Sequence, residues 1–192
     1  MLIEALAVAL GIANVTLIVR RNVWNYPFGI VMVSLYGYIF FDAKLYGEAG
    51  LQIFFVVIQF YGWWRWSRAI EHEGTLNVRW TDLSSIVLWL GVTAGVTMGL
   101  AYALGTWTDA VAPYPDATVS AASITAQILL ALRRIENWIY WIFVDIIAIW
   151  LFLSRELYLT AGLYAVFLVL ATTGLIVWWR AGRKRAAEQS QI

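Results

Sequence analysis

One acidic side chain lies deep within an apolar stretch of this sequence. Asp145 follows the run 138–144 and precedes the run 146–150, so we expect it near the middle of a helix. Trp138, Trp141 and Asp145 are spaced at i, i+3 and i+7, which places them on one helix face. Two indole rings beside a carboxylate can hold a flat, cationic or hydroxyl-bearing ring. The alternative is that Asp145 pairs with a hydroxyl or backbone group for packing, while the tryptophans fill space.

Amide side chains in other apolar stretches are candidates for the wall of the same site. Gln52 and Gln59 are at i and i+7 and share a helix face, while Asn14 and Gln127 lie in two further stretches. Amides donate and accept hydrogen bonds, which suits hydroxyl groups and a carboxamide. Buried glutamine serves equally well as a bridge between helices, so both roles stay open for each residue.

The composition that surrounds these residues is typical of a membrane protein. Of the 192 residues 13% are charged, against about a quarter in soluble domains, and the mean hydropathy is +0.73. A net charge of +1 without a clustered basic surface predicts no nucleic-acid partner. The absence of cysteine excludes disulfides and thiolate ligands, and the single His72 is expected to be a solvated loop residue. No metal or other cofactor is predicted.

Seven apolar runs are long enough to cross a bilayer as helices, since a hydrocarbon core about 30 Å thick takes about 20 residues. They lie near residues 2–19, 24–41, 46–64, 84–106, 117–132, 138–153 and 157–179. The polar stretches 65–83 and 110–116 are expected to be loops. The chain is therefore predicted to be an all-α membrane protein with one transmembrane domain over residues 1–192.

Basic residues fall almost entirely on one side of these predicted crossings. Eleven of the thirteen Lys and Arg residues share that side: Arg20, Arg21, Arg65, Arg68, Arg79, Arg133, Arg134, Arg180, Arg183, Lys184 and Arg185. Only Lys44 and Arg155 fall on the other side. By the positive-inside rule the N-terminus is predicted outside and the C-terminus inside, which requires an odd number of spans.

The sequence also contains an internal repeat: when it is aligned with itself at one constant offset, which pairs Arg21 with Arg133, many residues are identical. This repeat offset aligns, among others, Asn25 with Asn137, Tyr46 with Tyr158, Gly62 with Gly174 and Trp66 with Trp178. It predicts two parallel three-helix repeats, about 1–66 and 117–180, with a linker helix over about 84–106. This 3+1+3 arrangement needs the extra crossing because both repeats begin on the same side. Such repeats often build a solute path with a midplane site, although duplication could also merely have produced a stable bundle.

The two predicted repeats differ in chemistry at the binding face. Asp145 aligns with Val33, and Trp141 aligns with Gly29. The scaffold is therefore duplicated, whereas the binding face belongs mainly to the second repeat.

Two asparagines align with each other instead. Asn25 and Asn137 are expected either to cap equivalent helices or to face each other across the path. Glu136 is expected to serve the helix N-terminus or to pair with Arg133 or Arg134. A structural role is therefore predicted for Glu136, while both roles stay open for Asn137.

Three stretches resemble the PnuC family of bacterial vitamin transporters. They are residues 24–29, 45–63 and above all 136–145, whose Trp138, Trp141 and Asp145 are similar to the family's W-x-x-W-x-x-x-N/D motif. The resemblance covers nearly the whole chain. It implies a fold similar to an enlarged SWEET fold, a homotrimer in the bacterial inner membrane, and facilitated diffusion of a vitamin that a cytoplasmic kinase then phosphorylates. It also implies substrate contacts from Trp138, Trp141 and Asp145, with Gln52, Gln59, Asn137 and Gln127 as secondary candidates.

The resemblance leaves the vitamin open. Nicotinamide riboside is the usual substrate of the family, but similar carriers take thiamine or other B vitamins, and a ring cation in either would suit Asp145. An intramembrane enzyme or a sensor is the alternative of a different class. No span shows paired carboxylates, His or a Ser/His arrangement, and a retinal sensor needs a buried lysine, whereas Lys44 and Lys184 lie at helix ends. No P-loop is present, and uniport is favoured over proton coupling through Asp145.

Overall fold

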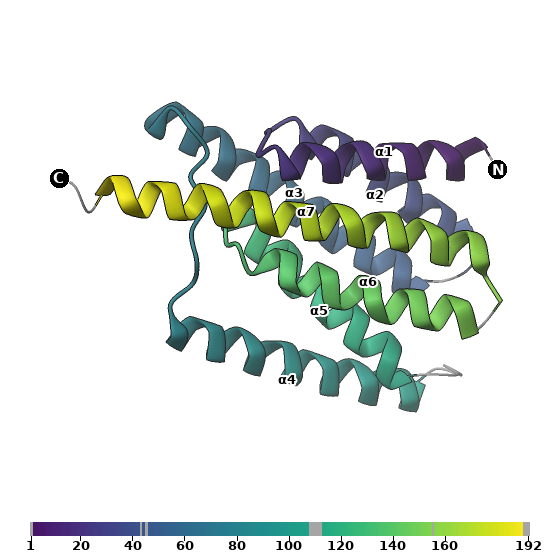
Figure 1. Ribbon diagram of the computed structural model, residues 1–192. Coiled ribbons are helices and arrows are strands. Elements are labelled where there is room, and N and C mark those ends of the chain that lie inside the picture. The colour runs from purple at the N-terminus through teal and green to yellow at the C-terminus, as the bar shows by residue number, and fades with distance from the viewer. Residues whose placement is uncertain (1, 43, 45, 108–112, 155, 190–192) are drawn as a thin grey trace.

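The chain is built from α-helices (Figure 1). The computed structural model describes residues 2–42, 44, 46–107, 113–154 and 156–189. Its seven helices are α1 (Leu2–Val19), α2 (Asn25–Asp42), α3 (Tyr46–Glu73), α4 (Leu83–Trp107), α5 (Pro113–Ala131), α6 (Asn137–Ser154) and α7 (Tyr158–Gln189). Within these residues the one β-type pairing is an isolated bridge between Arg79 and Arg134. The all-α fold predicted from the apolar runs is confirmed.

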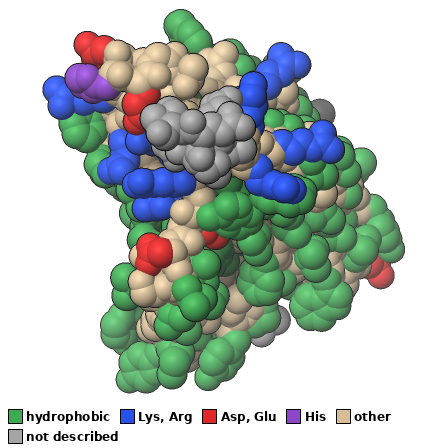
Figure 2. All heavy atoms as spheres, turned by 60° about the vertical axis from the view of Figure 1, so that its left-hand side comes forward, with side chains coloured by type: hydrophobic (Ala, Val, Ile, Leu, Met, Phe, Trp, Pro, Cys, Tyr) green, Lys and Arg blue, Asp and Glu red, His purple; other side chains and the backbone are tan. Residues whose placement is uncertain are grey.

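Within the part of the chain that the structure describes, three helices are long and apolar enough to cross a membrane: α4, α6 and residues Tyr158–Lys184 of α7. Large apolar side chains lie on the outer surface of the bundle, among them Met98, which is 72% exposed, and Leu159, which is 94% exposed. Figure 2 shows hydrophobic side chains covering the flank, with Lys and Arg gathered at the end of the bundle where α3 and α7 project. A surface of this kind is suited to lipid rather than to water.

Two helices extend past the apolar runs that predicted them. Helix α3 continues to Glu73, so the prediction of a loop over 65–83 is wrong as far as residue 73, and α7 continues to Gln189. The residues beyond the runs include many Arg, Glu and Ala, which favour helix in water as well as in lipid. Helix α3 ends at Glu73, and the next residue, Gly74, forms a C-terminal cap: its φ is 69°, and its N–H donates to the oxygen of Ile70 at 2.9 Å.

Helix α5 begins earlier than predicted. Pro113 opens it, so the predicted loop over 110–116 is helical from residue 113, while 110–112 lie outside the described residues. Proline is tolerated at the first helical position because the N–H it lacks would have no partner there. Its presence therefore marks the start of the helix instead of a loop.

Helix α4 begins at a capping carboxylate. Asp82 accepts hydrogen bonds from the backbone N–H of Ser85 at 3.1 Å, from its hydroxyl at 2.9 Å, and from the hydroxyl of Ser84. The side-chain bonds from Ser84 and Ser85 lower the pKa of Asp82 from 3.8 to about 2. The cap is therefore charged throughout the physiological pH range.

Positions related by the repeat offset have the same local structure. The turns after α1 and α5 place Arg21 and Arg133 at φ values of 56° and 61°, and those before α3 and α7 place Lys44 and Glu156 at 61° and 60°. Helix α1 packs against α2 and α7, as α5 packs against α6 and α3. Among the described helices, α4 packs against α5 and stands apart from the others (Figure 1), with one hydrogen bond from Thr93 to the hydroxyl of Tyr140 on α6.

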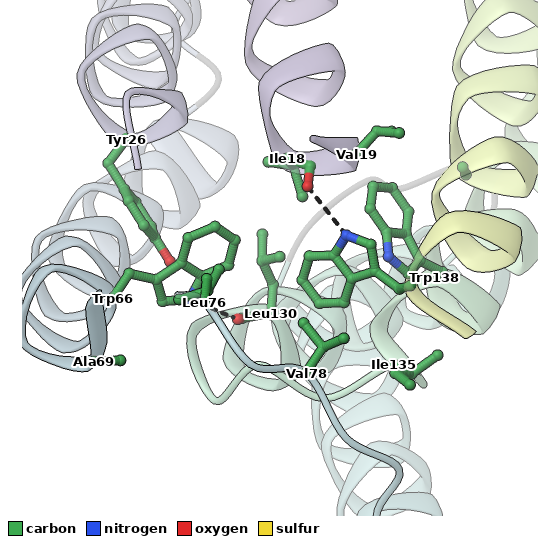
Figure 3. Close-up of a cluster of buried hydrophobic side chains, with 12 residues drawn as sticks. Ile18, Val19, Tyr26, Trp66, Ala69, Leu76, Val78, Leu130, Ile135 and Trp138 are labelled. Atoms are coloured by element: carbon green, nitrogen blue, oxygen red, sulfur yellow. Dashed lines mark hydrogen bonds between the residues drawn. The ribbon is translucent and has the colours of Figure 1, made fainter. Parts of the chain in front are cut away.

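An aromatic cluster fills one end of the bundle (Figure 3). Tyr26 packs edge-on against Trp66 with ring centroids 5.2 Å apart, and Trp138 packs edge-on against Trp178 at 5.5 Å. The indole N–H of Trp66 donates to a backbone oxygen of α5, and that of Trp178 donates to one of α1. The cluster therefore joins α1–α3 to α5–α7.

The segment between α3 and α4 crosses the same end of the bundle. Its Leu76 and Val78 are buried in the aromatic cluster. The backbone N–H of Arg79 donates to the oxygen of Arg133 at 3.3 Å, and Ile135 donates to the oxygen of Arg79 at 3.1 Å. The segment is thereby fixed across the turn between α5 and α6.

Candidate functional site

A cavity of about 450 Å³ lies inside the bundle. Side chains of α1, α2, α3, α5, α6 and α7 form its wall, whereas no described residue of α4 lines it. The volume falls within the range of small-molecule sites, roughly 300–1,000 Å³. Ile18 and Trp138 belong both to this wall and to the aromatic cluster, so the cluster forms one end of the cavity.

Helix α6 places the three residues of the predicted binding face on the cavity wall. Trp138, Trp141 and Asp145 all line it. Asp145 is 4% exposed, and no hydrogen bond or ion pair joins its carboxylate to another described residue. A carboxylate within an apolar bundle is costly unless it meets a partner. Its position therefore favours a partner supplied by a bound solute over a purely structural role.

The two tryptophans of α6 have different surroundings. Trp138 is 1% exposed and packs against Trp178, and its Nε1–H has no hydrogen-bond partner among the described residues. Trp141, one helical turn further along, is only partly buried. Trp141 thus has the more accessible ring for stacking, while Trp138 has a free donor at the end of the cavity.

Four amide side chains line the cavity from α1, α3 and α5: Asn14, Gln52, Gln59 and Gln127. The Nδ2 of Asn14 donates to the backbone oxygen of Asn25 at 2.6 Å, which fixes that amide. Gln59 and Gln127 are buried. The structure thus brings the three predicted glutamines and Asn14 to one cavity with Asp145; that they contact a solute stays a prediction.

Asn137 is not part of the cavity wall. Its Nδ2 donates to the backbone oxygen of Arg134 at 2.6 Å, and Asn25 makes the same bond to Asn22 at 2.7 Å. Both asparagines close the turn that precedes their helix. The two asparagines thus have equivalent places at the starts of α2 and α6, and the Oδ1 of Asn137 has no hydrogen-bond partner among the described residues.

Glu136 has a structural partner. Its carboxylate accepts a hydrogen bond from the backbone N–H of Thr81, while Arg133 forms its ion pair with Glu73 at 3.0 Å. Glu136 therefore holds the segment between α3 and α4 to the start of α6. Glu136 thus has a structural role, as expected from the sequence, and its hydrogen-bond partner is the backbone N–H of Thr81.

Hydroxyl groups form the part of the wall that the sequence did not predict. Tyr36 on α2, Ser123 on α5, and Thr160 and Tyr164 on α7 all line the cavity. Thr160 and Tyr164 are at i and i+4 and so share a face of α7, which is the one sequence signal that could have paired them. Together with the amides and Asp145, they give an otherwise apolar cavity several groups that can hydrogen-bond a polar solute.

The chain is similar to known transporters over most of its length. The family model described as nicotinamide mononucleotide transporter matches residues 1–180. The nicotinamide riboside transporter PnuC of Escherichia coli is 30% identical over 212 residues, which cover 96% of this chain and 88% of that protein. The riboflavin/roseoflavin transporter RibM of Streptomyces davaonensis is 26% identical over 185 residues, covering 91% and 83%.

A solved structure agrees with this similarity. The crystal structure of the vitamin B3 transporter PnuC matches with a TM-score of 0.78 at 27% identity, covering 95% of this chain and 82% of that one. The helical bundle described above is therefore the fold of a helical membrane transporter.

Proposed function

The chain belongs to the nicotinamide mononucleotide transporter family, and on that premise we propose that it carries a B-type vitamin across the bacterial inner membrane by facilitated diffusion. The resemblance inferred from its tryptophan and aspartate motif is confirmed by the family match. The chain is a multi-pass membrane protein. Nicotinamide riboside is the proposed substrate, because the relative in Escherichia coli is a transporter of that compound.

One observation supports a substrate that has a ring and a positive charge. Asp145, whose carboxylate has no hydrogen-bond or ion-pair partner among the described residues, and the partly buried ring of Trp141 lie on one wall of the cavity. A ring cation would be stacked by Trp141 and neutralised by Asp145, while Trp138 would offer its Nε1–H at the end of the cavity. Gln52, Gln59 and Gln127 would bind its hydroxyl and carboxamide groups, and Asn137 would fix the start of α6 that positions both tryptophans.

Thiamine or another B vitamin is the second candidate. The similarity to a riboflavin and roseoflavin transporter supports it, because that relative has a related sequence and a different vitamin. An intramembrane enzyme or sensor is not favoured, since the family is described by transport.

The proposal includes the arrangement of the chain in the membrane. Helices α1–α3 and α5–α7 would be two parallel repeats, α4 the linker of a 3+1+3 arrangement, and the N-terminus would lie outside. The turns that match at the repeat offset and the basic residues at one end of the bundle support it. A homotrimer and a cytoplasmic kinase that phosphorylates the vitamin belong to the same proposal through the family resemblance.

Binding to the purified protein tests the function. Calorimetry and tryptophan fluorescence quenching are applied to nicotinamide riboside, thiamine, pyridoxine and riboflavin. Nicotinamide riboside is expected to bind most tightly. Tighter binding of thiamine would transfer the assignment to the second candidate, and binding of none of the four would contradict a vitamin carrier.

A further inference from the structure

Gly29 lies where two amide groups of the cavity wall converge. A β-carbon at this position would overlap Oε1 of Gln59 and lie 2.5 Å from Nδ2 of Asn14. Both contacts are closer than the 3.0 Å that β-carbons in proteins respect. Only glycine at this position therefore leaves both amides where they are.

The two amides are held in a confined space. The Nδ2 of Asn14 is bonded to the backbone oxygen of Asn25 at 2.6 Å, and Gln59 on α3 is 4% exposed. Gly29 is itself buried between them on α2. An added methyl group would consequently displace the amides, because it would occupy the space of their polar ends.

At the equivalent positions in the second half of the chain, large side chains are replaced by small ones and the glycine by a large one. By the repeat offset, Asn14, Gly29 and Gln59 correspond in that order to Ala126, Trp141 and Ala171. A glycine thus accompanies two amides in the first half of the chain, whereas a tryptophan accompanies two alanines in the second. Asn14, Gln59, Trp141 and Ala171 all line the cavity. The first half therefore contributes this amide pair to the cavity, and the second half contributes the indole of Trp141.

We propose that Gly29 is a positioning residue that selects the solute. Because glycine has no β-carbon, the amides of Asn14 and Gln59 occupy that space and form a polar wall in the cavity that Trp141 also lines. The inference rests on the proposed function. An amide pair both donates and accepts hydrogen bonds, so it recognises a solute with a hydroxyl or carboxamide edge beside its stacking ring. A flat ring without such an edge leaves buried amides unpaired, which is a strong basis for rejection.

Close packing of helices is the other common use of a buried glycine. At Gly29, however, the nearest atoms to an added β-carbon are the amide ends of two side chains and not backbone. Such ends can turn, so Gly29→Ala is expected to fold with the amides displaced. Gly37 on the same helix is the matched control, because its added β-carbon would meet the β-carbon of Gln52 at an ordinary 3.4 Å.

The test is a mutant cycle on binding of nicotinamide riboside and thiamine to the purified protein. Gly29→Ala and Gln59→Ala are each expected to weaken binding of nicotinamide riboside by about tenfold, as for a lost hydrogen bond to a polar solute. In a background that lacks both amides, Asn14→Ala with Gln59→Ala, adding Gly29→Ala should not weaken binding further, because the methyl group then displaces neither amide. Gly29→Ala should also alter the ratio of the two affinities, and Gly37→Ala should not.

A further loss of affinity when Gly29→Ala is added to the background without both amides, or wild-type affinity in Gly29→Ala, would overturn this inference and leave the proposed function intact. A wild-type protein that binds no vitamin would overturn both. Thermal unfolding monitors folding of each variant. Should Gly29→Ala alone not fold, the triple variant decides, because it lacks both amides. Affinity equal to that of the Asn14→Ala, Gln59→Ala variant supports positioning, and weaker affinity refutes it.

Discussion

Trp66 and Trp178 are equivalent positions in the two halves of the sequence, and they contact each other in the structure with ring centroids 5.9 Å apart. The Nε1–H of Trp66 donates to the backbone oxygen of Leu130 at 3.2 Å, and that of Trp178 donates to Ile18 at 3.1 Å (Figure 3). Ile18 and Leu130 are themselves related by the repeat offset. The two bonds are therefore crossed equivalents that tie α3 to the end of α5 and α7 to the end of α1.

Loss of either crossed bond is expected to open the cavity toward the aromatic cluster. Trp66→Phe or Trp178→Phe keeps a ring but removes the donor, at a cost of about 0.5–1.5 kcal/mol for one lost hydrogen bond. The backbone oxygens of Leu130 and Ile18 still accept the N–H groups of Arg133 and Arg21. Because the chain contains no cysteine, a single Ser123→Cys substitution on the cavity wall reports opening by its rate of labelling with a thiol reagent. Labelling from the side of the aromatic cluster should rise about fivefold or more, since about 1 kcal/mol shifts a population by that factor.

The matched control for these bonds is Trp64→Phe. Trp64 is on α3 close to Trp66 but is exposed, so its replacement should leave labelling of the reporter cysteine unchanged. Equal labelling rates in wild type and in both buried-tryptophan variants would contradict a closing role for the crossed bonds.

Replacement of Trp141 should weaken vitamin binding. Trp141→Ala removes the partly buried ring on the cavity wall, and the expected loss is at least about 1 kcal/mol, the scale of an aromatic or cation–π contact. Isothermal calorimetry measures it. Trp150→Ala, on the exposed surface of the same helix, is the control and should bind as the wild type does. Equal affinities of the two variants would move the site away from α6.

The helices were predictable from the sequence because each one contains an apolar run, and a run needs a helix to satisfy its backbone in lipid. The ends of α3 and α7 were not, because both helices continue into polar sequence that favours helix outside the membrane. The stop signal at Gly74 depends on a φ of 69°, which a glycine allows but does not require.

The candidate site was predictable only where polar residues mark the inner face of a helix. Asp145 fixes the inner face of α6, and the spacing then adds Trp138 and Trp141. The apolar part of α7 has little periodicity, so the inward direction of Thr160 and Tyr164 emerges only from packing. Asn137 shares α6 with the site residues, but its place at the helix start directs its amide to the preceding turn.

Vitamin uptake is expected to be independent of a proton gradient. Facilitated diffusion needs no titrating group, so a protonophore should leave uptake into proteoliposomes unchanged. Asp145→Asn should weaken binding of a cationic vitamin about tenfold or more, because a hydrogen bond to a charged group is worth about 1.5–3 kcal/mol. Its uptake should stay independent of pH. Asp42→Asn, on the exposed end of α2, is the control. Uptake by the wild type that ceased without a proton gradient would contradict uniport.

Stability should depend on two glycines that the aromatic cluster covers. A β-carbon at Gly62 would lie 2.5 Å from the hydroxyl oxygen of Tyr26, and one at Gly174 would lie 2.5 Å from ring atoms of Trp138. These rings are fixed by their edge-on contacts, so they cannot turn away as a flexible chain would. Gly62→Ala and Gly174→Ala are each expected to destabilise the protein by about 1–3 kcal/mol, the usual cost of overpacking.

The controls for that pair are also equivalent positions of the two halves. An added β-carbon at Gly50 or Gly162 would meet no atom within 4 Å, and both positions are exposed on helices. Alanine there should leave the thermal unfolding temperature unchanged or raise it, because it favours helix over glycine by up to about 1 kcal/mol. Unfolding is followed in detergent by tryptophan fluorescence. Equal shifts in all four variants would mean that helix propensity, and not contact with the rings, decides the effect of these glycines.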